Sequence, residues 1–187
     1  MINKDYKNRR DKLLKTIKVN SAAVIFSAEE KYRNNDVTYK YRQSSNFYYL
    51  TGVNDSSLTL LLIKKNNSSS SILICNRPNQ IDKIWTGQLP SKNRYKKMYS
   101  IDQVLYIDEL NKLDLKDIDN LYFEFDDKSK IENFLSSINQ VESPRYTKKN
   151  SYLSSRIDLS KLIFNMRTTK SKHEISQISN AANISVQ

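Results

Sequence analysis

Few side chains in this sequence could carry out chemistry, because it has one histidine, His173, and one cysteine, Cys75. A zinc site of the His-Glu-x-x-His type requires two histidines, a cysteine cluster requires several thiols, and a Ser–His–Asp triad requires a histidine beside suitable partners. None of these arrangements can be built here. A glycine-rich phosphate-binding loop is also excluded, because the only glycines are Gly52 and Gly87. Composition alone therefore supports no catalytic mechanism.

Carboxylate pairs are the remaining candidates for metal or acid–base chemistry. They are Asp126 with Asp127, and Asp117 with Asp119. Because they lack histidine partners, we interpret them as helix caps and loop residues and not as metal ligands. His173 falls in the first turn of a predicted helix, where we interpret it as a solvated surface residue. No catalytic residue and no metal ligand is assigned in this chain.

The charge of the chain is strongly positive, with 31 lysines and arginines against 20 acidic residues and a net charge of +11. Such a charge could indicate a nucleic-acid partner. However, the basic residues are scattered in short runs such as Lys7 to Arg10 and Lys148-Lys149, and each run is interpreted as a solvated face or loop. We attribute the excess of Lys, Asn, Ser and Ile to an AT-rich genome. A nucleic-acid partner is therefore the less favoured hypothesis, because it rests on charge alone.

Length and patterning favour a globular protein. A chain of 187 residues can bury a sizeable core, and its twelve tyrosines argue against wholesale disorder. No window contains the roughly 18 consecutive apolar residues that a membrane span needs. Residues 1–18 are charged and lack the apolar core of a signal peptide. Together with the single cysteine, which excludes an internal disulfide, these features predict a cytoplasmic protein without a membrane partner.

The elements that would position any site follow from the spacing of apolar residues. Short apolar runs bounded by polar residues predict buried strands at 22–26, 58–63, 71–75, 104–107 and 121–125. Residues 64–70 are predicted to form a polar hairpin loop. Apolar residues three or four positions apart predict helices at 5–18 and 128–138. Buried strands alternating with helices predict an α/β fold with helices on both faces of a sheet.

The C-terminal part is predicted to be helical. Asp158 can cap a helix that runs through Met166, and Ser171 with Glu174 fits a capping box, so that another helix starts near Lys172. No terminating glycine follows the apolar positions of this last helix. Without a partner, its apolar side offers little to offset the entropy of ordering, and we expect it to be poorly ordered or to mediate association. Its apolar residues are Ile175, Ile178, Ala181, Ala182 and Val186.

Residues 39–52, YKYRQSSNFYYLTG, resemble a signature of the N-terminal domain of the aminopeptidase P (Xaa-Pro aminopeptidase) family of creatinase/prolidase-type metallopeptidases. The family pattern is approximately R-x-x-D-x-x-Y-x-Y-R-Q-x-S-x-F-x-Y-L-T-G-F, and the chain departs from it at Val53, where Phe is usual. Matching residues are Arg33, Asp36, Tyr39, Tyr41, Arg42, Gln43, Ser45, Phe47, Tyr49, Leu50, Thr51 and Gly52.

Three further segments carry the same resemblance. Residues 22–26 match the family upstream of the signature, and residues 82–87 are similar to its E-x-W-x-G motif. Residues 166–175 are similar to M-R-x-x-K-S-P-E-E-I, the motif that joins the two domains of the family, although Lys172 and His173 replace its Pro and Glu. The resemblance thus spans essentially the whole chain.

The resemblance implies a mixed β-sheet with helices on both faces over residues 1–157. Residues 158–187 would form an inter-domain helix and the truncated start of a catalytic domain of pita-bread fold. In the family, that second domain holds two metal ions, usually manganese, through two Asp, one His and two Glu, and the metals activate a water that attacks an Xaa-Pro bond. None of these ligands has a matching position in this chain, so we expect it to be inactive alone.

The resemblance also suggests roles for individual residues. Trp85 matches a family tryptophan that reaches the active site of a neighbouring subunit, which implies a substrate-pocket role in a homo-oligomer; a partly buried core tryptophan is the alternative. The signature is interpreted as mainly structural, with Arg42 and Gln43 holding an irregular loop to the sheet and Phe47 and Tyr49 burying area in the core. The residues interpreted in this way are Tyr39, Tyr41, Arg42, Gln43, Ser45, Phe47, Tyr49 and Gly52.

The sequence therefore predicts the non-catalytic N-terminal domain of an Xaa-Pro aminopeptidase, supporting substrate access and the assembly of domains or subunits. Three explanations for the missing catalytic half stay open: a fragment, a separate chain that supplies this half, or a relic of a decayed gene. A stand-alone peptide- or protein-binding module is the alternative function from a different class.

Overall fold

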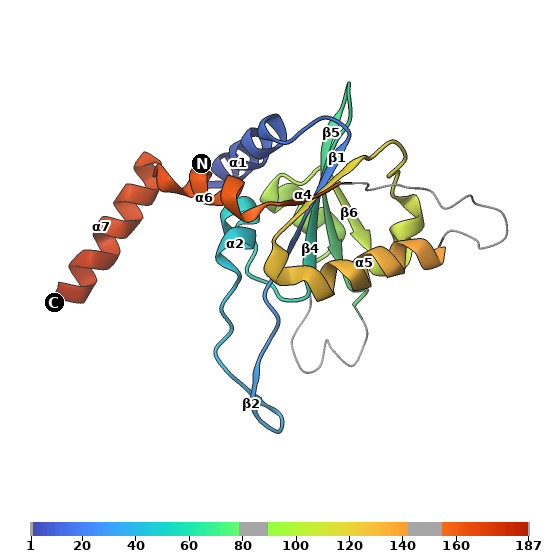
Figure 1. The fold of residues 1–187 in the computed structure, drawn as a ribbon. Helices are drawn as coiled ribbons and strands as arrows, with labels where there is room; N and C mark the ends of the chain where they lie inside the picture. The colour runs from blue at the N-terminus through green and yellow to red at the C-terminus, as the bar shows by residue number, and fades with distance from the viewer. Residues whose placement is uncertain (1, 79–89, 142–154, 187) are drawn as a thin grey trace.

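The computed structural model describes residues 2–78, 90–141 and 155–186, and its centre is a six-stranded sheet (Figure 1). The strands lie in the order β6-β5-β4-β1-β7-β8. β4 is antiparallel to both of its neighbours, β1 and β5, whereas the other three pairs are parallel. The sheet is therefore mixed, as predicted. The strand bounds are β1 Ser21–Phe26, β4 Leu58–Lys64, β5 Ser69–Cys75, β6 Gln103–Tyr106, β7 Asn120–Phe123 and β8 Ser155–Asp158.

Helices cover both faces of this sheet (Figure 1). On one face lie α1 (Ile2–Thr16), α2 (Ser45–Thr51), α4 (Lys92–Tyr99) and α6 (Ser160–Thr168). On the other lie α5 (Lys128–Val141) and the 3-10 helix η1 (Ile107–Lys112). A short 3-10 turn, η2 (Phe125–Asp127), precedes α5. No helix within the described ranges is both long and apolar enough to cross a membrane.

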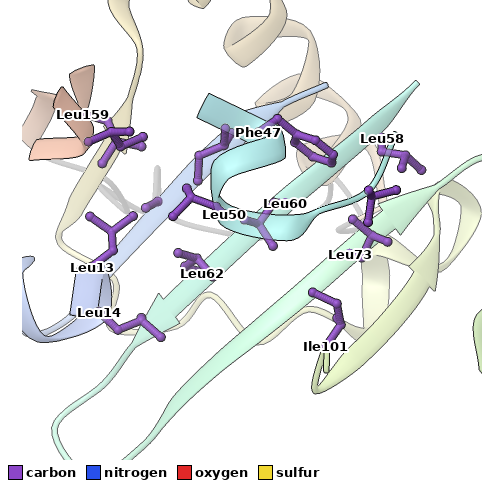
Figure 2. Close-up of a cluster of buried hydrophobic side chains, with 14 of the residues drawn as sticks. Leu13, Leu14, Phe47, Leu50, Leu58, Leu60, Leu62, Leu73, Ile101 and Leu159 are labelled. Carbon is purple, nitrogen blue, oxygen red and sulfur yellow. The ribbon is translucent and has the colours of Figure 1, made fainter. Parts of the chain in front are cut away.

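The two central strands are buried on both faces because their side chains alternate between two apolar clusters. One cluster packs under α1, α2 and α6 (Figure 2), and the other packs under α5. Each fully buried Leu or Ile stabilises the fold by roughly 1.5–3 kcal/mol. The first cluster takes Ala23, Ile25, Leu58, Leu60 and Leu62 from β1 and β4. The second takes Ala22, Val24, Leu61 and Ile63.

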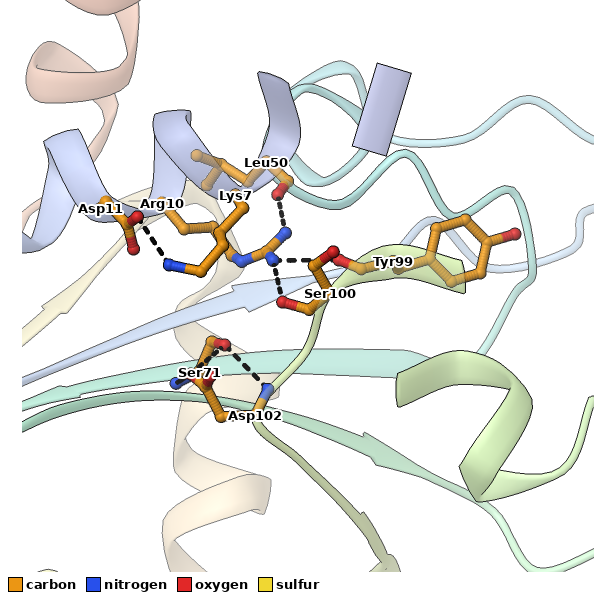
Figure 3. A network of polar contacts seen from close by, with 8 residues as sticks. All are labelled: Lys7, Arg10, Asp11, Leu50, Ser71, Tyr99, Ser100 and Asp102. Atoms are coloured by element: carbon orange, nitrogen blue, oxygen red, sulfur yellow. Dashed lines mark hydrogen bonds and ion pairs between the residues drawn. The ribbon is translucent and has the colours of Figure 1, made fainter. Parts of the chain in front are cut away.

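A buried arginine on α1 ties three elements together on the first face. Arg10 is 1% exposed, and its Nη1 donates to the Leu50 carbonyl oxygen at 2.8 Å. Its Nη2 donates to the carbonyl oxygens of Tyr99 at 3.0 Å and Ser100 at 2.6 Å (Figure 3). Burial lowers the pKa of this guanidinium to about 10, although Asp102 opposes the change. Arg10 therefore joins α1 to the C-terminal ends of α2 and α4, and the prediction that this basic run is a solvated face is wrong at this position.

Most predicted elements are confirmed, with shorter strands in two places. β6 ends at Tyr106 and β7 at Phe123, because the next apolar residues are not in the core. Ile107 is 50% exposed in η1, and Phe125 is 52% exposed in η2. The predicted hairpin loop also shortens to residues 65–68, since Lys65 N–H donates to the Ser68 carbonyl oxygen at 2.8 Å and the ladder continues on either side.

Two parts of the chain extend away from the layered body (Figure 1). The first is a separate two-stranded hairpin, β2 (Tyr32–Asn34) and β3 (Val37–Thr38), whose side chains are exposed. The second is α7 (Lys172–Val186), which buries none of its residues. The predicted capping box is confirmed at its start: Ser171 N–H donates to Glu174 Oε2 at 2.8 Å, and Glu174 N–H donates to Ser171 Oγ at 3.2 Å.

Candidate functional site

The signature segment forms the helix α2, which is capped at both ends. Ser44 is the N-cap of α2, and its Oγ accepts from the backbone N–H of Phe47 at 3.5 Å. Gly52 ends the helix in the left-handed region, with φ 72°, and its N–H donates to the Tyr48 carbonyl oxygen at 2.8 Å. Thr51 Oγ1 donates to the Phe47 carbonyl oxygen at 2.8 Å and accepts from Val53 N–H at 3.1 Å. The segment therefore satisfies the backbone groups at both ends of α2 by itself.

Gln43 connects the loop before α2 to the loops after β1 and before β4. Its side chain is buried, and its Nε2 donates to the carbonyl oxygens of Val53 at 3.2 Å and Asp55 at 2.8 Å. Its Oε1 accepts from Ala28 N–H at 2.7 Å and Ser44 N–H at 2.9 Å. A glutamine amide has two N–H donors and an oxygen with two lone pairs, so the full capacity of this one is used.

Replacing Gln43 with glutamate should lower the free energy of unfolding by roughly 3 kcal/mol, because a carboxylate cannot donate to the two carbonyl oxygens and is itself buried beside them. Urea unfolding followed by circular dichroism measures the change. Gln103→Glu is the matched control: Gln103 is exposed on β6, and its replacement should change the stability by no more than roughly 0.5 kcal/mol. Equal losses in the two variants would contradict the role of Gln43.

The tyrosine and arginine next to Gln43 have different environments. Tyr41 Oη donates to the carbonyl oxygen of Ala28 at 3.2 Å and lies 3.3 Å from that of Asp55. Burial raises its pKa to about 12. Arg42 is exposed and reaches only Ser45 Oγ, at 3.4 Å, among the described side chains. Tyr39 is 58% exposed at the base of the hairpin. The structure therefore brings Tyr41 and Gln43 together and leaves Arg42 and Tyr39 at the surface.

Phe47 and Tyr49 leave α2 on different sides. Phe47 is fully buried in the first cluster. Tyr49 is half-buried, donates from Oη to the Met166 carbonyl oxygen at 3.1 Å, and has the Arg9 guanidinium carbon 4.3 Å from its ring centroid. Burial raises the pKa of Tyr49, and the charge of Arg9 opposes the rise. Tyr49 is thus where α2, α1 and α6 meet.

A groove of about 990 Å³ opens beside Tyr49, between α1, α2, α6 and the start of α7. We call it the α1–α7 groove. Arg9 crosses it, with Nη2 3.2 Å from Glu174 Oε1 and Nη1 donating to the Tyr49 carbonyl oxygen at 3.0 Å. The wall is mainly aromatic and basic. Its residues are Tyr6, Arg9, Ser45, Tyr48, Tyr49, Phe164, Arg167, Thr168, Lys170, His173, Glu174, Gln177 and Ile178.

A second pocket, of about 580 Å³, lies near the base of the hairpin, where Tyr32 and Tyr41 line it. Asp55 lines it and accepts from Tyr95 Oη at 2.8 Å, while burial, followed by this hydrogen bond, raises the pKa of Tyr95. Cys75 also lines it, and burial raises the pKa of its thiol to about 11. A thiol with this pKa is protonated and unreactive at neutral pH, so the pocket offers no nucleophile through Cys75.

Trp85 lies outside the described residues, so its substrate-pocket role stays a prediction. Within the described part of the chain, no group of three or more His, Cys, Asp or Glu side chains could hold a metal ion. His173 is exposed at the groove, as its place in the first turn of α7 predicts.

Sequence reasoning missed two residues that shape the groove, Arg9 and Arg167. Arg9 stands three positions after Tyr6 on α1, the spacing that places both on one side of a helix, and its guanidinium carbon is 5.2 Å from the Tyr6 ring centroid. Arg167 falls within residues 166–175, the segment similar to the motif that joins the two domains of the family. Its Nη1 donates to Asn46 Oδ1 at 2.6 Å, which joins α6 to α2.

Comparison with known proteins gives consistent matches along the chain. Residues 6–120 match the family model described as "Aminopeptidase P, N-terminal domain". The Xaa-Pro aminopeptidase of Haemophilus influenzae is 30% identical over 105 residues, which cover 56% of this chain and 24% of that protein. The solved aminopeptidase P of Escherichia coli, in its low-pH form, superposes with a TM-score of 0.79 at 27% identity and covers 93% of this chain. Proline aminopeptidase P II from Yersinia pestis superposes with a TM-score of 0.80 at 28% identity and covers 94%.

The match occupies only part of each longer protein. The chain spans about a quarter of the length of the Haemophilus influenzae relative. It spans 40% of the solved Escherichia coli chain and 41% of the Yersinia pestis chain. The larger part of each of these proteins therefore has no counterpart in the sequence described here.

Proposed function

Because this chain belongs to the aminopeptidase P N-terminal domain family, we propose that it acts as the non-catalytic half of an Xaa-Pro aminopeptidase. In this role, it supports substrate access and the assembly of subunits or domains around a catalytic domain that removes an N-terminal residue preceding proline. One observation carries the proposal: the fold matches the Escherichia coli enzyme over 93% of this chain while accounting for only 40% of that enzyme.

The surface of the chain supports a role in assembly. α7 buries none of its residues, and Ile175 and Ile178 are 54% and 57% exposed. Exposed apolar side chains gathered on one element are typical of a surface that another protein surface covers. The α1–α7 groove adjoins this helix. The exposed apolar residues of α7 and the groove therefore lie on the same side of the molecule, where we expect the catalytic domain to make contact.

The metal chemistry of the proposed enzyme belongs to the catalytic domain. The family resemblance implies two manganese ions, and the described residues of this chain do not fit them, since none form a cluster of suitable ligands. When bound, such ions supply an activated water as the nucleophile. We propose that this chain contributes binding and positioning only. A cytoplasmic location is part of the same proposal.

A domain exchange tests the proposal. The part of the Escherichia coli enzyme that this chain matches is replaced by this chain, and the hydrolysis of an Xaa-Pro tripeptide is measured with Mn²⁺. The chimera should be at least about tenfold more active, in kcat/KM, than the same enzyme with that part deleted, which corresponds to about 1.4 kcal/mol. The restored surface should position substrate and stabilise the catalytic domain.

The control is the chain alone, which should release no amino acid above the protein-free blank with or without Mn²⁺, because it matches none of the ligand positions of the family. A folded chimera that is no more active than the deletion variant would overturn the proposed role. So would metal-dependent turnover by the chain alone that survives repurification.

A further inference from the structure

The charges of the α1–α7 groove are unbalanced. Arg9 is paired with Glu174 across it, at 3.2 Å. Arg167 and Lys170, by contrast, form hydrogen bonds with neutral groups: Arg167 donates to Asn46 Oδ1 at 2.6 Å, and Lys170 Nζ donates to the Thr168 carbonyl oxygen at 3.1 Å. Both side chains are exposed, and neither forms an ion pair within the described residues. The groove therefore presents two positive charges that form no ion pair among the described residues, and Glu174, whose charge Lys170 also feels, is already paired with Arg9.

Apolar side chains stand beside these charges. Phe164, one turn before Thr168 on α6, is 70% exposed, and Ile178 on α7 is 57% exposed. Tyr48 is 44% exposed on α2 and packs edge-on against Tyr6, with ring centroids 5.9 Å apart. All four residues line the groove. A ligand that fills it must cover apolar surface and also supply negative charge.

A protein segment fits this combination better than a nucleic acid does. Bases can stack on Tyr48 and Phe164, but Ile178 offers them no flat partner. An amphipathic segment can place apolar residues on Phe164 and Ile178 and carboxylates on Arg167 and Lys170. Carboxylate–guanidinium pairs are favoured there because the guanidinium can donate two parallel hydrogen bonds.

We propose that the α1–α7 groove docks an acidic amphipathic segment of a partner protein. The apolar side chains of that segment cover Phe164 and Ile178, and its carboxylates pair with Arg167 and Lys170. This inference rests on the proposed function, under which the segment belongs to the surface of the catalytic half. It adds the chemistry of that surface: apolar, with carboxylates at two positions.

Two synthetic helical peptides serve as probes. They have leucines at the same positions, and their polar positions carry either glutamate or lysine. Fluorescence anisotropy at physiological salt should show that the glutamate peptide binds the chain with a Kd at least about tenfold lower than the lysine peptide. Arg167→Glu/Lys170→Glu should raise the Kd of the glutamate peptide by at least about tenfold. Phe164→Ser should also raise it, because the apolar contact is lost.

The matched control is Lys96→Glu/Lys97→Glu, which changes the net charge by the same amount in the last turn of α4, at exposed positions that do not line the groove. It should leave the Kd within about twofold, since distant exposed charges are screened. Equal weakening by the two pairs would overturn the proposal, as would equal binding of both peptides or displacement of the peptide by a single-stranded oligonucleotide.

Folding of the variants is checked by circular dichroism. If Arg167→Glu/Lys170→Glu does not fold, Arg167→Gln/Lys170→Gln replaces it, and an unchanged Kd in that variant would count against the proposal. An active chimera together with a negative peptide result would leave the proposed function standing and refute only the acidic partner of the groove.

Discussion

Replacing Arg10 with methionine is expected to lower the free energy of unfolding by about 3–5 kcal/mol. Methionine retains an unbranched stem of similar length, so the loss reports mainly on the guanidinium. Three carbonyl oxygens, of Leu50, Tyr99 and Ser100, would lose a charged donor in a site where Arg10 is 1% exposed. Buried acceptors left without a partner cost about 1–3 kcal/mol each, and water can recover part of this loss. Urea unfolding followed by tyrosine fluorescence measures the change.

Lys7→Met on the same helix is the control for this prediction. Lys7 pairs with Asp11 at 2.8 Å, and its side chain is 50% exposed, so its removal should cost less than about 1 kcal/mol. Arg10→Lys should recover only part of the stability, because one ammonium group cannot span the carbonyls of two helix ends. Comparable losses for Lys7→Met and Arg10→Met would show that Arg10 does not connect α1 to α2 and α4.

Replacing Gly52 with alanine should destabilise the fold by roughly 3 kcal/mol, from two separate causes. The φ of 72° costs a residue with a Cβ about 1–2 kcal/mol. In addition, a Cβ at this position would lie 2.3 Å from Cε2 of Tyr6, so the Tyr6 ring would have to move out of its contact with Tyr48. The C-terminal end of α2 would then lose its packing on α1.

A double-mutant cycle separates the two causes. In a Tyr6→Ala background, the ring that opposes the new methyl group is gone, so Gly52→Ala should cost only the backbone component, roughly 1–2 kcal/mol. Thermal unfolding of the four proteins gives the coupling energy. An equal cost of Gly52→Ala in both backgrounds would show that the contact with Tyr6 contributes nothing.

The helices and strands that could be predicted are those whose own apolar residues recur at helical or strand spacing. α1 and the pair β4 and β5 have apolar residues at helical or strand spacing, and their burial follows from that spacing. α4 has one buried residue, Tyr95, among lysines, so no apolar period marks it. β8 has four residues at the edge of the sheet, and its pairing with β7 depends on residues far away in the sequence. Three of the seven residues of α2 are aromatic and have weak helix preference, and tertiary packing of Phe47 and Leu50 decides its conformation.

The same distinction applies to the candidate site. Gln43 could be identified as a donor for an irregular loop, but its partners lie on separate loops, at Ala28, Val53 and Asp55, which the sequence does not relate to one another. Arg42, given the same role, lies at the surface instead. The basic run that contains Arg10 predicts a solvated face, because nothing local shows that the C-terminal ends of two helices converge on this residue. Charge runs can therefore conceal a buried arginine whose partners are backbone carbonyls.

The pairing of β1 has a consequence for the order in which the sheet forms during synthesis. Ser21 pairs with Lys64 on one side and with Asn120 on the other. β4 and β5 need only the connection 65–68, so this hairpin can form as soon as it leaves the ribosome. β1 can join β4 early, but its other edge stays open until β7 has been made. A nascent chain that pauses before residue 120 therefore exposes an apolar strand edge at the centre of the future sheet, which is the kind of edge that recruits strands from other chains.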